Sequence, residues 1–565
     1  MELVNKTIGQ CLKETAAKYP DQTAIEYENW TCTWRELDEV TDLLAARMMN
    51  EYGIRQGSHV GIWSLNSPAF VQTVLAVYKL GAVVIVFNTA NSASEMADQL
   101  KLSDTEVLFY GAGSRGVIFD EMIPRIREDV SEDLRFIHID EREAGVWLTP
   151  ASFPEEERSI LPADKVRSIT SGLDAQTAAC IIFTSGTTSK PKAVVLTHFG
   201  IVNVNLRVQK CMHWTHNDKT VASVSMYHGF GLNTALTASV IVGMTMHVIP
   251  SFRTEDVWEA IDKYRCTVML GVPSMYLALV RKPGNGKYDA SSLTSGIIGG
   301  SVISTDEYRE ITSRFPGIHL NPSFGMTEAS TSSSFSDWDE PLRSGQITGG
   351  MFIEDTMARI RDLASGEIVG WSNSASGIYG PGGKNTSGEL ELTGFCLFKE
   401  YYNMPEATRE TMTDDGWLKT GDIAYFNDFD ELCLTGRKKE LIIRSGENIS
   451  PREIEEAILQ SGVTKQVKVV GVPSRLTQEE IAACIVAEEG TAIDAAALIA
   501  FLKQKLSYYK IPKYIFSFRE LPMTASGKIK LGQLKETAAG LASDTESLKQ
   551  INLSDNNRYY FSDMI

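Results

Sequence analysis

Short apolar runs alternate with amphipathic segments from the N-terminus to about residue 435. The runs have the length of strands, and they lie at 60–62, 83–87, 107–110, 135–139, 179–184 and 267–272. Apolar runs that alternate with helical patterns are typical of βαβ units, in which helices cover parallel strands. This part of the chain is therefore predicted to have an α/β fold, with parallel-rich sheets layered with helices.

The chain is too long for one hydrophobic core, because single cores stop growing at roughly 250 to 300 residues and this chain has 565. A charged patch at 436–440 separates two apolar runs, and we place a domain boundary there. After it, Ser450, Pro451 and Glu453 are typical of a helix N-cap, a first helical position and a capping box. We predict a large N-terminal domain at 1–436, a small mobile α+β domain at 437–535, and a polar tail at 536–565.

The balance of charge excludes some classes of partner. Lys and Arg total 54 against 72 for Asp and Glu, which gives a formal net charge of −18. Such a charge argues against a surface for nucleic acid, so any phosphate site has to be locally basic. The eight cysteines lack metal-finger spacing, and the most apolar segment, 69–87, is interrupted by Gln72 and Lys79. We therefore expect a cytoplasmic protein with buried thiols and no membrane span.

The strongest local signal is the sequence Ser-Gly-Thr-Thr-Ser at 185–189, which lies between two apolar runs and just before Lys192. A hydroxyl-rich loop that follows a strand can direct N–H groups at phosphate oxygens, and Lys192 would add positive charge. An ordinary turn of the same composition is the alternative.

The order of residues from 185 to 193 resembles the phosphate loop of the adenylate-forming superfamily, which includes acyl-CoA synthetases, peptide-synthetase adenylation domains and beetle luciferases. That family usually has glycine where this chain has Ser189 and Ala193, and neither change removes a donor. Further family motifs follow in the family's order from about Trp34 to Lys530. The resemblance implies that the loop binds the phosphates of ATP through Thr184, Ser185, Gly186, Thr187, Thr188 and Lys192.

Two motifs resemble the family's acyl pocket. His228 and Gly229, in Tyr-His-Gly-Phe-Gly, resemble its histidine motif, and Gly299-Gly300-Ser301 resembles its Gly-Gly-Ala, where the close approach of a ligand requires small residues. The resemblance implies that Gly299 and Ser301 line the acyl pocket and that Gly300 and Ser301 contact ATP or AMP. A structural role is the alternative for a single histidine. No aspartate that would bind an amino group lies beside His228, which disfavours an amino-acid substrate.

The segment 323–328, Ser-Phe-Gly-Met-Thr-Glu, resembles the family's adenine motif. The resemblance implies that Phe324 stacks on adenine, that Thr327 meets the α-phosphate and that Glu328 holds Mg²⁺. Without it, Phe324 would be a core residue and Glu328 a carboxylate at a helix start. The residues of this motif that are predicted to bind ATP or AMP are Ser323, Phe324, Gly325, Met326 and Thr327.

Later motifs resemble the family's ribose site, its hinge, its catalytic lysine and the loop that contacts coenzyme A in the second half-reaction. By resemblance, Asp422 and Arg437 bind the ribose, Lys439 is the hinge, and Lys528 is the catalytic lysine between the attacking carboxylate and the α-phosphate. The residues predicted to contact coenzyme A are Ser445, Gly446 and Glu447. The Gly- and Ser-rich segment at 370–387 is predicted to be a surface insertion.

The resemblance implies an ATP-dependent ligase that joins a small carboxylic acid, fatty or aryl, to coenzyme A. Pyrophosphate would leave as acyl-AMP forms, and AMP would leave as the thioester forms. The cofactors would be ATP, Mg²⁺ and coenzyme A. The residues implied in catalysis are Lys528, Thr327, Glu328 and His228. Three alternatives stay open: transfer to a carrier-protein phosphopantetheine, a non-catalytic nucleotide or acyl binder, and luciferase-type oxidation.

Overall fold

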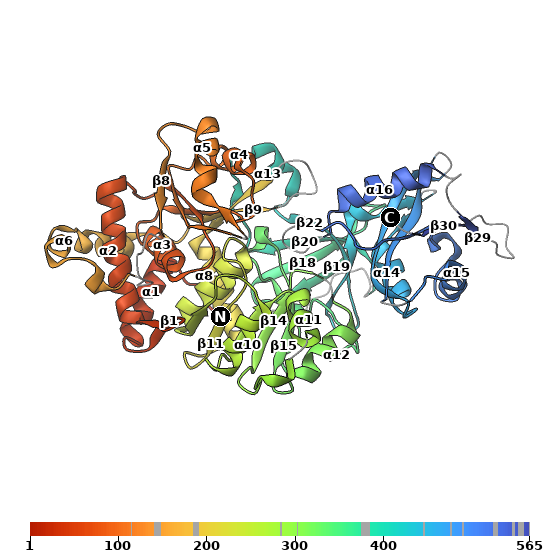
Figure 1. Cartoon of the computed structure of the whole chain (residues 1–565), viewed down its shortest axis with the longest axis horizontal. Helices are drawn as coiled ribbons and strands as arrows, with labels where there is room; N and C mark the ends of the chain where they lie inside the picture. Colours follow the sequence, from red (N-terminus) through yellow and green to blue (C-terminus); the bar gives the residue numbers. More distant parts are fainter. Residues whose placement is uncertain are drawn as a thin grey trace.

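The computed structural model describes residues 1–565, except 115, 140–147, 185–190, 283–284, 302, 374–384, 445–446, 475–476, 489–490, 524–528, 545–548, 552–558 and 564–565. Figure 1 shows the elements up to about residue 435 packed together, with the blue C-terminal elements beside them. None of the helices within these described ranges combines the length and the apolar character that crossing a membrane requires.

Two large sheets confirm the α/β prediction. The first has the strand order β21-β10-β9-β4-β3-β5-β8, with parallel pairing from β9 to β8 and antiparallel β10 and β21 at the other edge. Helix α3, Pro68–Lys79, is buried along its whole length. The strands of this sheet are β3 His59–Trp63, β4 Val83–Val86, β5 Val107–Tyr110, β8 Arg135–His138, β9 Ala178–Thr184, β10 Lys192–Thr197 and β21 Glu400–Tyr401.

The second sheet has the order β17-β16-β15-β14-β13-β11-β12-β1-β2, and it is parallel from β15 to β1. The ends of β14 and β15 carry the Gly-Gly-Ser and Phe-Gly-Met-Thr-Glu motifs. The strands are β1 Thr23–Tyr27, β2 Trp30–Thr33, β11 Lys219–Ala222, β12 Thr245–Val248, β13 Val268–Gly271, β14 Ser295–Gly299, β15 His319–Phe324, β16 Ser334–Phe335 and β17 Met351–Phe352.

Helices cover these sheets, as the prediction of layered α/β architecture requires. Capping boxes at Thr7, Thr33, Ser92 and Ser304 start four of them. Besides α3, the α-helices described in this part are α1 Ile8–Lys18, α2 Trp34–Tyr52, α4 Ala93–Leu102, α5 Phe119–Asp129, α6 Glu155–Ile160, α7 Ala163–Gly172, α8 His198–Met212, α9 Thr237–Val242, α10 Thr254–Asp262, α11 Pro273–Arg281, α12 Thr305–Arg314 and α13 Pro405–Thr411. A short hairpin joins β6 Gly113–Ser114 to β7 Val117–Ile118.

A third sheet differs from the prediction of largely parallel pairing, because every strand pair in it is antiparallel. Its order is β19-β18-β20-β22-β23, and hairpins such as the one from β22 to β23 need only a short turn. Residues 370–373 of the predicted insertion belong to β19, and 374–384 lie outside the described residues. The strands are β18 Thr356–Arg361, β19 Ile368–Asn373, β20 Gly388–Gly394, β22 Leu418–Phe426 and β23 Leu432–Arg437.

The C-terminal elements form a separate mixed sheet with its own hydrophobic core. The predicted capping box at Ser450 is wrong: its hydroxyl donates to the Thr435 carbonyl of β23, and the Arg452 side chain donates to the Leu434 carbonyl. The elements are β24 Ile442–Arg444, β25 Glu447–Ile449, α14 Pro451–Leu459, β26 Thr464–Ser474, β27 Gln478–Ala487, α15 Ala495–Lys503, β28 Tyr514–Ser517, α16 Leu531–Ser543, β29 Lys549–Ile551 and β30 Tyr559–Asp563.

The residues predicted as a polar tail contain regular structure. Helix α16 runs to Ser543, and β30 pairs in parallel with β28, so the small sheet extends beyond the predicted limit at residue 535. The reason is local: Leu534 and Ala538 give α16 a buried face, and Phe561 is buried in β30. The polar composition of the segment hid these few apolar positions.

Candidate active site

The two ends of the predicted phosphate loop are held by strand pairing. Thr184, the last residue of β9, is paired with Lys192, the first residue of β10. The loop residues Ser185, Gly186, Thr187 and Thr188 lie outside the described residues. Lys192 therefore marks the place where the loop returns to the sheet.

Lys192 and Glu328, from two distant motifs, meet at Tyr401. The Lys192 ammonium lies 4.3 Å from the centre of the Tyr401 ring, and the Tyr401 hydroxyl donates a 2.8 Å hydrogen bond to Glu328 Oε1. Thr411 Oγ1 lies 3.4 Å from Lys192 Nζ. A cation and a carboxylate thus share one aromatic residue in a largely buried corner.

The electrostatics of this corner depend on burial. Burial lowers the pKa of Lys192, the Glu328 carboxylate acts in the opposite direction, and the Lys439 ammonium lowers it further. Burial and the charge of Glu328 both raise the pKa of Tyr401, so its hydroxyl keeps its proton and stays a donor. The predicted hinge residue Lys439, which is exposed in the turn Lys438–Glu440, is therefore within electrostatic reach of Lys192.

Glycines keep the ends of β14 and β15 free of side chains. A Cβ at Gly299 would lie 2.7 Å from the Ser323 carbonyl oxygen, and one at Gly325 would lie 1.6 Å from that of Thr331. Gly300 has φ +78°, a left-handed conformation that favours glycine. Ligands of open α/β sheets bind at the carboxyl ends of the strands, which is where these glycines lie.

The adenine motif presents side chains of different exposure. Phe324 is only 7% exposed, and its ring is perpendicular to that of Phe352 with the centroids 6.4 Å apart. Ser323, Met326 and Thr327 are half-buried, so they remain partly accessible from outside. The predicted stacking of Phe324 on a base therefore depends on the small part of its ring that packing leaves exposed.

The histidine motif lies next to the adenine motif. His228 is exposed, its ring centroid is 4.4 Å from that of Tyr227, and a π-helix, Phe230–Leu236, follows Gly229. π-Helical turns are frequent at functional sites. A Cβ at Gly229 would lie 2.7 Å from Thr331 Oγ1, and Thr331 follows Glu328 closely in the chain. The two motifs therefore meet at Thr331.

Thr331 itself was not predicted from the sequence. It has φ +94°, which is rare for a β-branched residue, and its buried hydroxyl has no partner in the part of the chain that the structure describes. Strain and unpaired polar atoms of this kind cluster at functional sites. No sequence pattern distinguishes it from the other Ser and Thr residues nearby.

Asp422 and Arg437 are paired across β22 and β23. Arg437 Nε lies 2.6 Å from Asp422 Oδ1, while the buried Asp422 Oδ2 has no hydrogen-bond partner among the described residues. Burial raises the pKa of Asp422 to about 6, although Arg437 opposes that shift. An unpaired carboxylate oxygen is an acceptor for hydroxyl groups such as those of a ribose.

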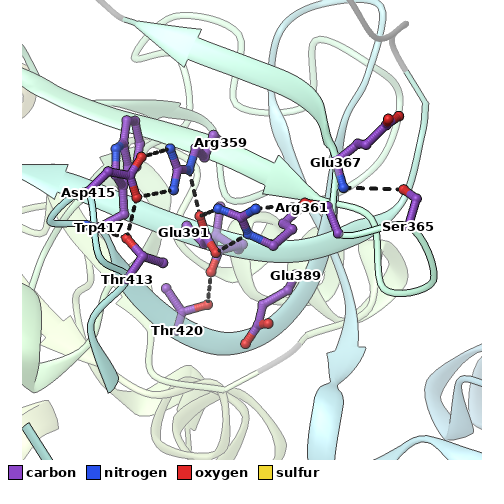
Figure 2. Close-up of polar contacts among 12 residues, drawn as sticks. Arg359, Arg361, Ser365, Glu367, Glu389, Glu391, Thr413, Asp415, Trp417 and Thr420 are labelled. Atoms are coloured by element: carbon purple, nitrogen blue, oxygen red, sulfur yellow. Dashed lines mark hydrogen bonds and ion pairs between the residues drawn. The ribbon is translucent and has the colours of Figure 1, made fainter. Parts of the chain in front are cut away.

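A buried ion network lies in the same sheet (Figure 2). Glu391, which is fully buried, receives hydrogen bonds from Arg359 at 2.5 Å and from Arg361 at 2.6 Å. Arg359 also binds both oxygens of Asp415, and its guanidinium lies 4.3 Å from the Trp417 ring. The network joins β18 and β20 to the start of β22, the strand that carries Asp422.

The remaining predicted residues are placed only in part. Lys528, Ser445 and Gly446 lie outside the described residues, and Glu447 begins β25, where its backbone is paired with Arg444. Met523 and Ile529, the described residues on either side of 524–528, form an antiparallel bridge.

The described residues fit a nucleoside triphosphate with a magnesium ion. Lys192 supplies positive charge, Glu328 supplies a hard oxygen ligand, Asp422 Oδ2 is an unpaired acceptor, and the glycines around Gly300 leave room for close approach. Groups of three or more His, Cys, Asp or Glu side chains that could share a metal do not occur within the described ranges.

Comparison with known proteins gives a consistent result. Residues 12–402 match the family model described as "AMP-binding enzyme", and residues 453–528 match "AMP-binding enzyme C-terminal domain". YngI of Bacillus subtilis (strain 168), named as a putative acyl-CoA synthetase, is 33% identical over 559 residues, which cover 95% of this chain and 97% of YngI.

A mitochondrial relative and a solved structure extend the comparison. The medium-chain acyl-CoA ligase ACSF2 of Bos taurus is 29% identical over 558 residues, covering 95% of this chain and 88% of the relative. The ATP-bound crystal structure of MatB from Rhodopseudomonas palustris has a TM-score of 0.78 at 23% identity, covering 95% of this chain and 100% of that one. That likeness shows a shared fold.

Proposed function

Because the chain belongs to the AMP-binding enzyme family, we propose that its site activates a carboxylic acid with ATP and then transfers the acyl group to coenzyme A. The protein is an AMP-forming acid–CoA ligase that uses ATP, Mg²⁺ and coenzyme A. The observation that carries the proposal is the meeting of Lys192 and Glu328 at Tyr401, because it joins a predicted phosphate cation to a predicted metal ligand.

The first half-reaction requires that a carboxylate approach a triphosphate despite their mutual repulsion. Lys192, with the loop that it ends, would bind the phosphates, and the unpaired Oδ2 of the Asp422 carboxylate would accept hydrogen bonds from the ribose hydroxyls. Bound Mg²⁺ would neutralise part of the triphosphate charge. The Glu328 carboxylate would hold that ion, and Lys528 would bring the attacking carboxylate to the α-phosphate. In-line attack then releases pyrophosphate and leaves acyl-AMP.

The second half-reaction requires that a thiol reach the acyl carbon of acyl-AMP. We propose that residues 1–436 and the small domain that begins at 437 turn relative to each other about Lys439, so that Ser445, Gly446 and Glu447 replace Lys528 at the site. The turn at Lys439 lies between β23, the last strand of the third sheet, and β24, the first strand of the small sheet, which supports this proposal. Thiol attack then releases AMP.

The substrate is proposed to be a hydrophobic acid that enters near His228 and Gly229. The name of the bovine relative, a medium-chain ligase, favours a fatty acid over an aryl acid. Coenzyme A is the proposed acceptor rather than a carrier protein, since both relatives are named for coenzyme A. The cytoplasmic location stays a prediction, supported by the eight cysteines, which are all free thiols.

Pyrophosphate exchange tests the proposal directly. The purified protein is incubated with ATP, MgCl₂ and labelled pyrophosphate, together with short, medium or long straight-chain acids or with aryl acids. We expect exchange that needs both an acid and Mg²⁺, with medium-chain acids the best. Thioester formation is then compared between coenzyme A and acyl carrier proteins. Exchange that is independent of any acid would overturn the proposed function, and a thioester formed only on a carrier protein would overturn the acceptor.

A further inference from the structure

We propose that Tyr401 is a positioning residue for the magnesium–nucleotide site, which it serves by holding Glu328 and Lys192 apart and in place. The inference rests on the proposed function and adds a residue that none of the sequence motifs contains. Tyr401 is 2% exposed, and its two ends carry out different tasks: the hydroxyl contacts the carboxylate and the ring face contacts the ammonium.

Strand pairing brings the Tyr401 ring to Lys192. Val194 of β10 is paired with Tyr401 of β21, and Lys192 lies two residues before Val194, on the same face of the strand. Main-chain bonds from Tyr402 N to Ala193 O and from Lys399 N to Val195 O hold the short strand in this register. The ring therefore lies beneath the flexible lysine side chain and restricts where its ammonium can go.

The same segment holds Glu328 at two points. The Phe398 N–H donates to the Glu328 main-chain carbonyl at 2.7 Å, and the Tyr401 hydroxyl donates to Oε1 at 2.8 Å. Because one carboxylate oxygen accepts a hydrogen bond from the phenol, the orientation of the carboxylate is fixed while the other oxygen remains able to bind a cation. Tyr401 thus orients the predicted metal ligand without replacing the metal.

Tyr401 lies between Lys192 and Glu328 and keeps them from forming a direct ion pair. A lysine and a glutamate in one buried corner attract each other, and a direct ion pair would neutralise both. Here the two groups contact different parts of Tyr401, and no ion pair joins them among the described contacts. The ammonium stays available to phosphate and the carboxylate to a cation.

Two substitutions separate the two tasks. Tyr401→Phe keeps the ring under Lys192 and removes the interactions of the hydroxyl, which are those with Glu328 and Thr411. Tyr401→Leu also removes the ring face from Lys192. Tyr402→Phe is the matched control, because the Tyr402 hydroxyl donates to Asp104 Oδ2 at 3.0 Å, away from this corner. Thermal unfolding followed by circular dichroism shows whether each variant is folded.

The readout is binding of ATP by calorimetry, without any carboxylic acid and over a range of MgCl₂ concentrations. For Tyr401→Phe we expect the MgCl₂ concentration that gives half of the full affinity to rise about tenfold, the effect of losing one hydrogen bond to a charged group. Its affinity for ATP without MgCl₂ should stay within about twofold of wild type. Tyr401→Leu should lose affinity about tenfold even without MgCl₂, because Lys192 is released.

A purely structural role for Tyr401 would lower the unfolding temperature and leave the MgCl₂ dependence of Tyr401→Phe unchanged, and that result would overturn the inference. Equal losses at every MgCl₂ concentration would also overturn it. Failure of the proposed function looks different: the wild-type protein would bind ATP with the expected MgCl₂ dependence but show no acid-dependent pyrophosphate exchange. A wild-type protein that binds no ATP would overturn both.

Discussion

Asp422 and Arg437 face each other across two antiparallel strands, and the ion pair between them uses only one of the two Asp422 oxygens. The other oxygen is buried without a partner among the described residues, although burying an unpaired carboxylate oxygen is unfavourable. This relationship indicates a site made for a ligand with hydroxyl groups.

Asp422→Asn is expected to weaken ATP binding about tenfold or more, because a hydrogen bond to a charged group contributes about 1.5–3 kcal/mol. The amide keeps the shape of the side chain, so the loss reflects the charge. Calorimetry should compare ATP with its 2′-deoxy and 3′-deoxy analogues. If Asp422 contacts the ribose, removing a ribose hydroxyl from the nucleotide lowers the affinity of the wild-type protein more than that of the variant. Equal losses in both proteins would contradict it.

The affinity for ATP is expected to fall as the pH drops through about 6, because burial raises the pKa of Asp422 to about 6 and a protonated carboxyl is a poorer acceptor. ATP itself titrates near this pH, so Asp422→Asn, which has no carboxyl to protonate, serves as the control for the nucleotide. The predicted result is a steeper pH dependence in the wild-type protein. Parallel curves would contradict it.

The raised pKa of Asp422 also makes the free energy of unfolding depend on pH. The folded protein binds a proton at Asp422 more tightly than the unfolded chain does, so this group makes the free energy of unfolding decrease as the pH rises from about 4 to about 6. Asp422→Asn should therefore gain unfolding temperature relative to wild type as the pH rises over this range, without ligand. A constant difference between the two proteins would refute the prediction.

Glu391→Gln is expected to lower the free energy of unfolding by about 3 kcal/mol, because it leaves Arg359 buried with an incomplete set of negative partners. Urea unfolding measures the change. The matched control is Asp306→Asn, whose exposed pair with Arg309 should contribute less than about 1 kcal/mol. A loss of similar size in both variants would mean that the network of Figure 2 stabilises the fold no more than an exposed ion pair does.

Lys528→Ala is expected to slow formation of acyl-AMP by about 10²- to 10³-fold, the effect of removing one donor that stabilises developing charge. Thioester formation from supplied acyl-AMP should change much less, since the role proposed for Lys528 belongs to the first half-reaction. Lys530→Ala, an exposed lysine two residues away, is the control. Single-turnover measurements of each step separate the two. Equal losses in both steps would show that the role given to Lys528 is wrong.

Local patterns predicted much of the fold and missed the third sheet. Buried parallel strands are continuous apolar runs such as Val83–Val86, which are easy to detect. The strand Gly388–Gly394 instead mixes glutamates with leucines, and its Glu391 is buried only because two arginines from a neighbouring strand neutralise it. A pattern of hydrophobicity cannot show such a partner.

The same limit applies to the candidate site. Motif order drew attention to Lys192, Glu328 and Asp422, because each lies in a run of residues that resembles a family pattern. Tyr401 and Thr331 were missed, since their importance comes from strand pairing and from a strained backbone angle that single residues do not encode. Residues that position other residues are defined by contacts in space.

The hydrogen bonds from Ser450 and Arg452 to the carbonyls of β23 have a consequence for the cycle between the two half-reactions. The acceptors are main-chain carbonyls, so substitutions of side chains on β23 do not remove them. The two hydrogen bonds therefore persist when the sequence of that strand changes. If the C-terminal region turns about Lys439 as proposed, both donors have to exchange their carbonyls for water. The free energy needed to break these two hydrogen bonds would then contribute to the time between release of pyrophosphate and arrival of the thiol.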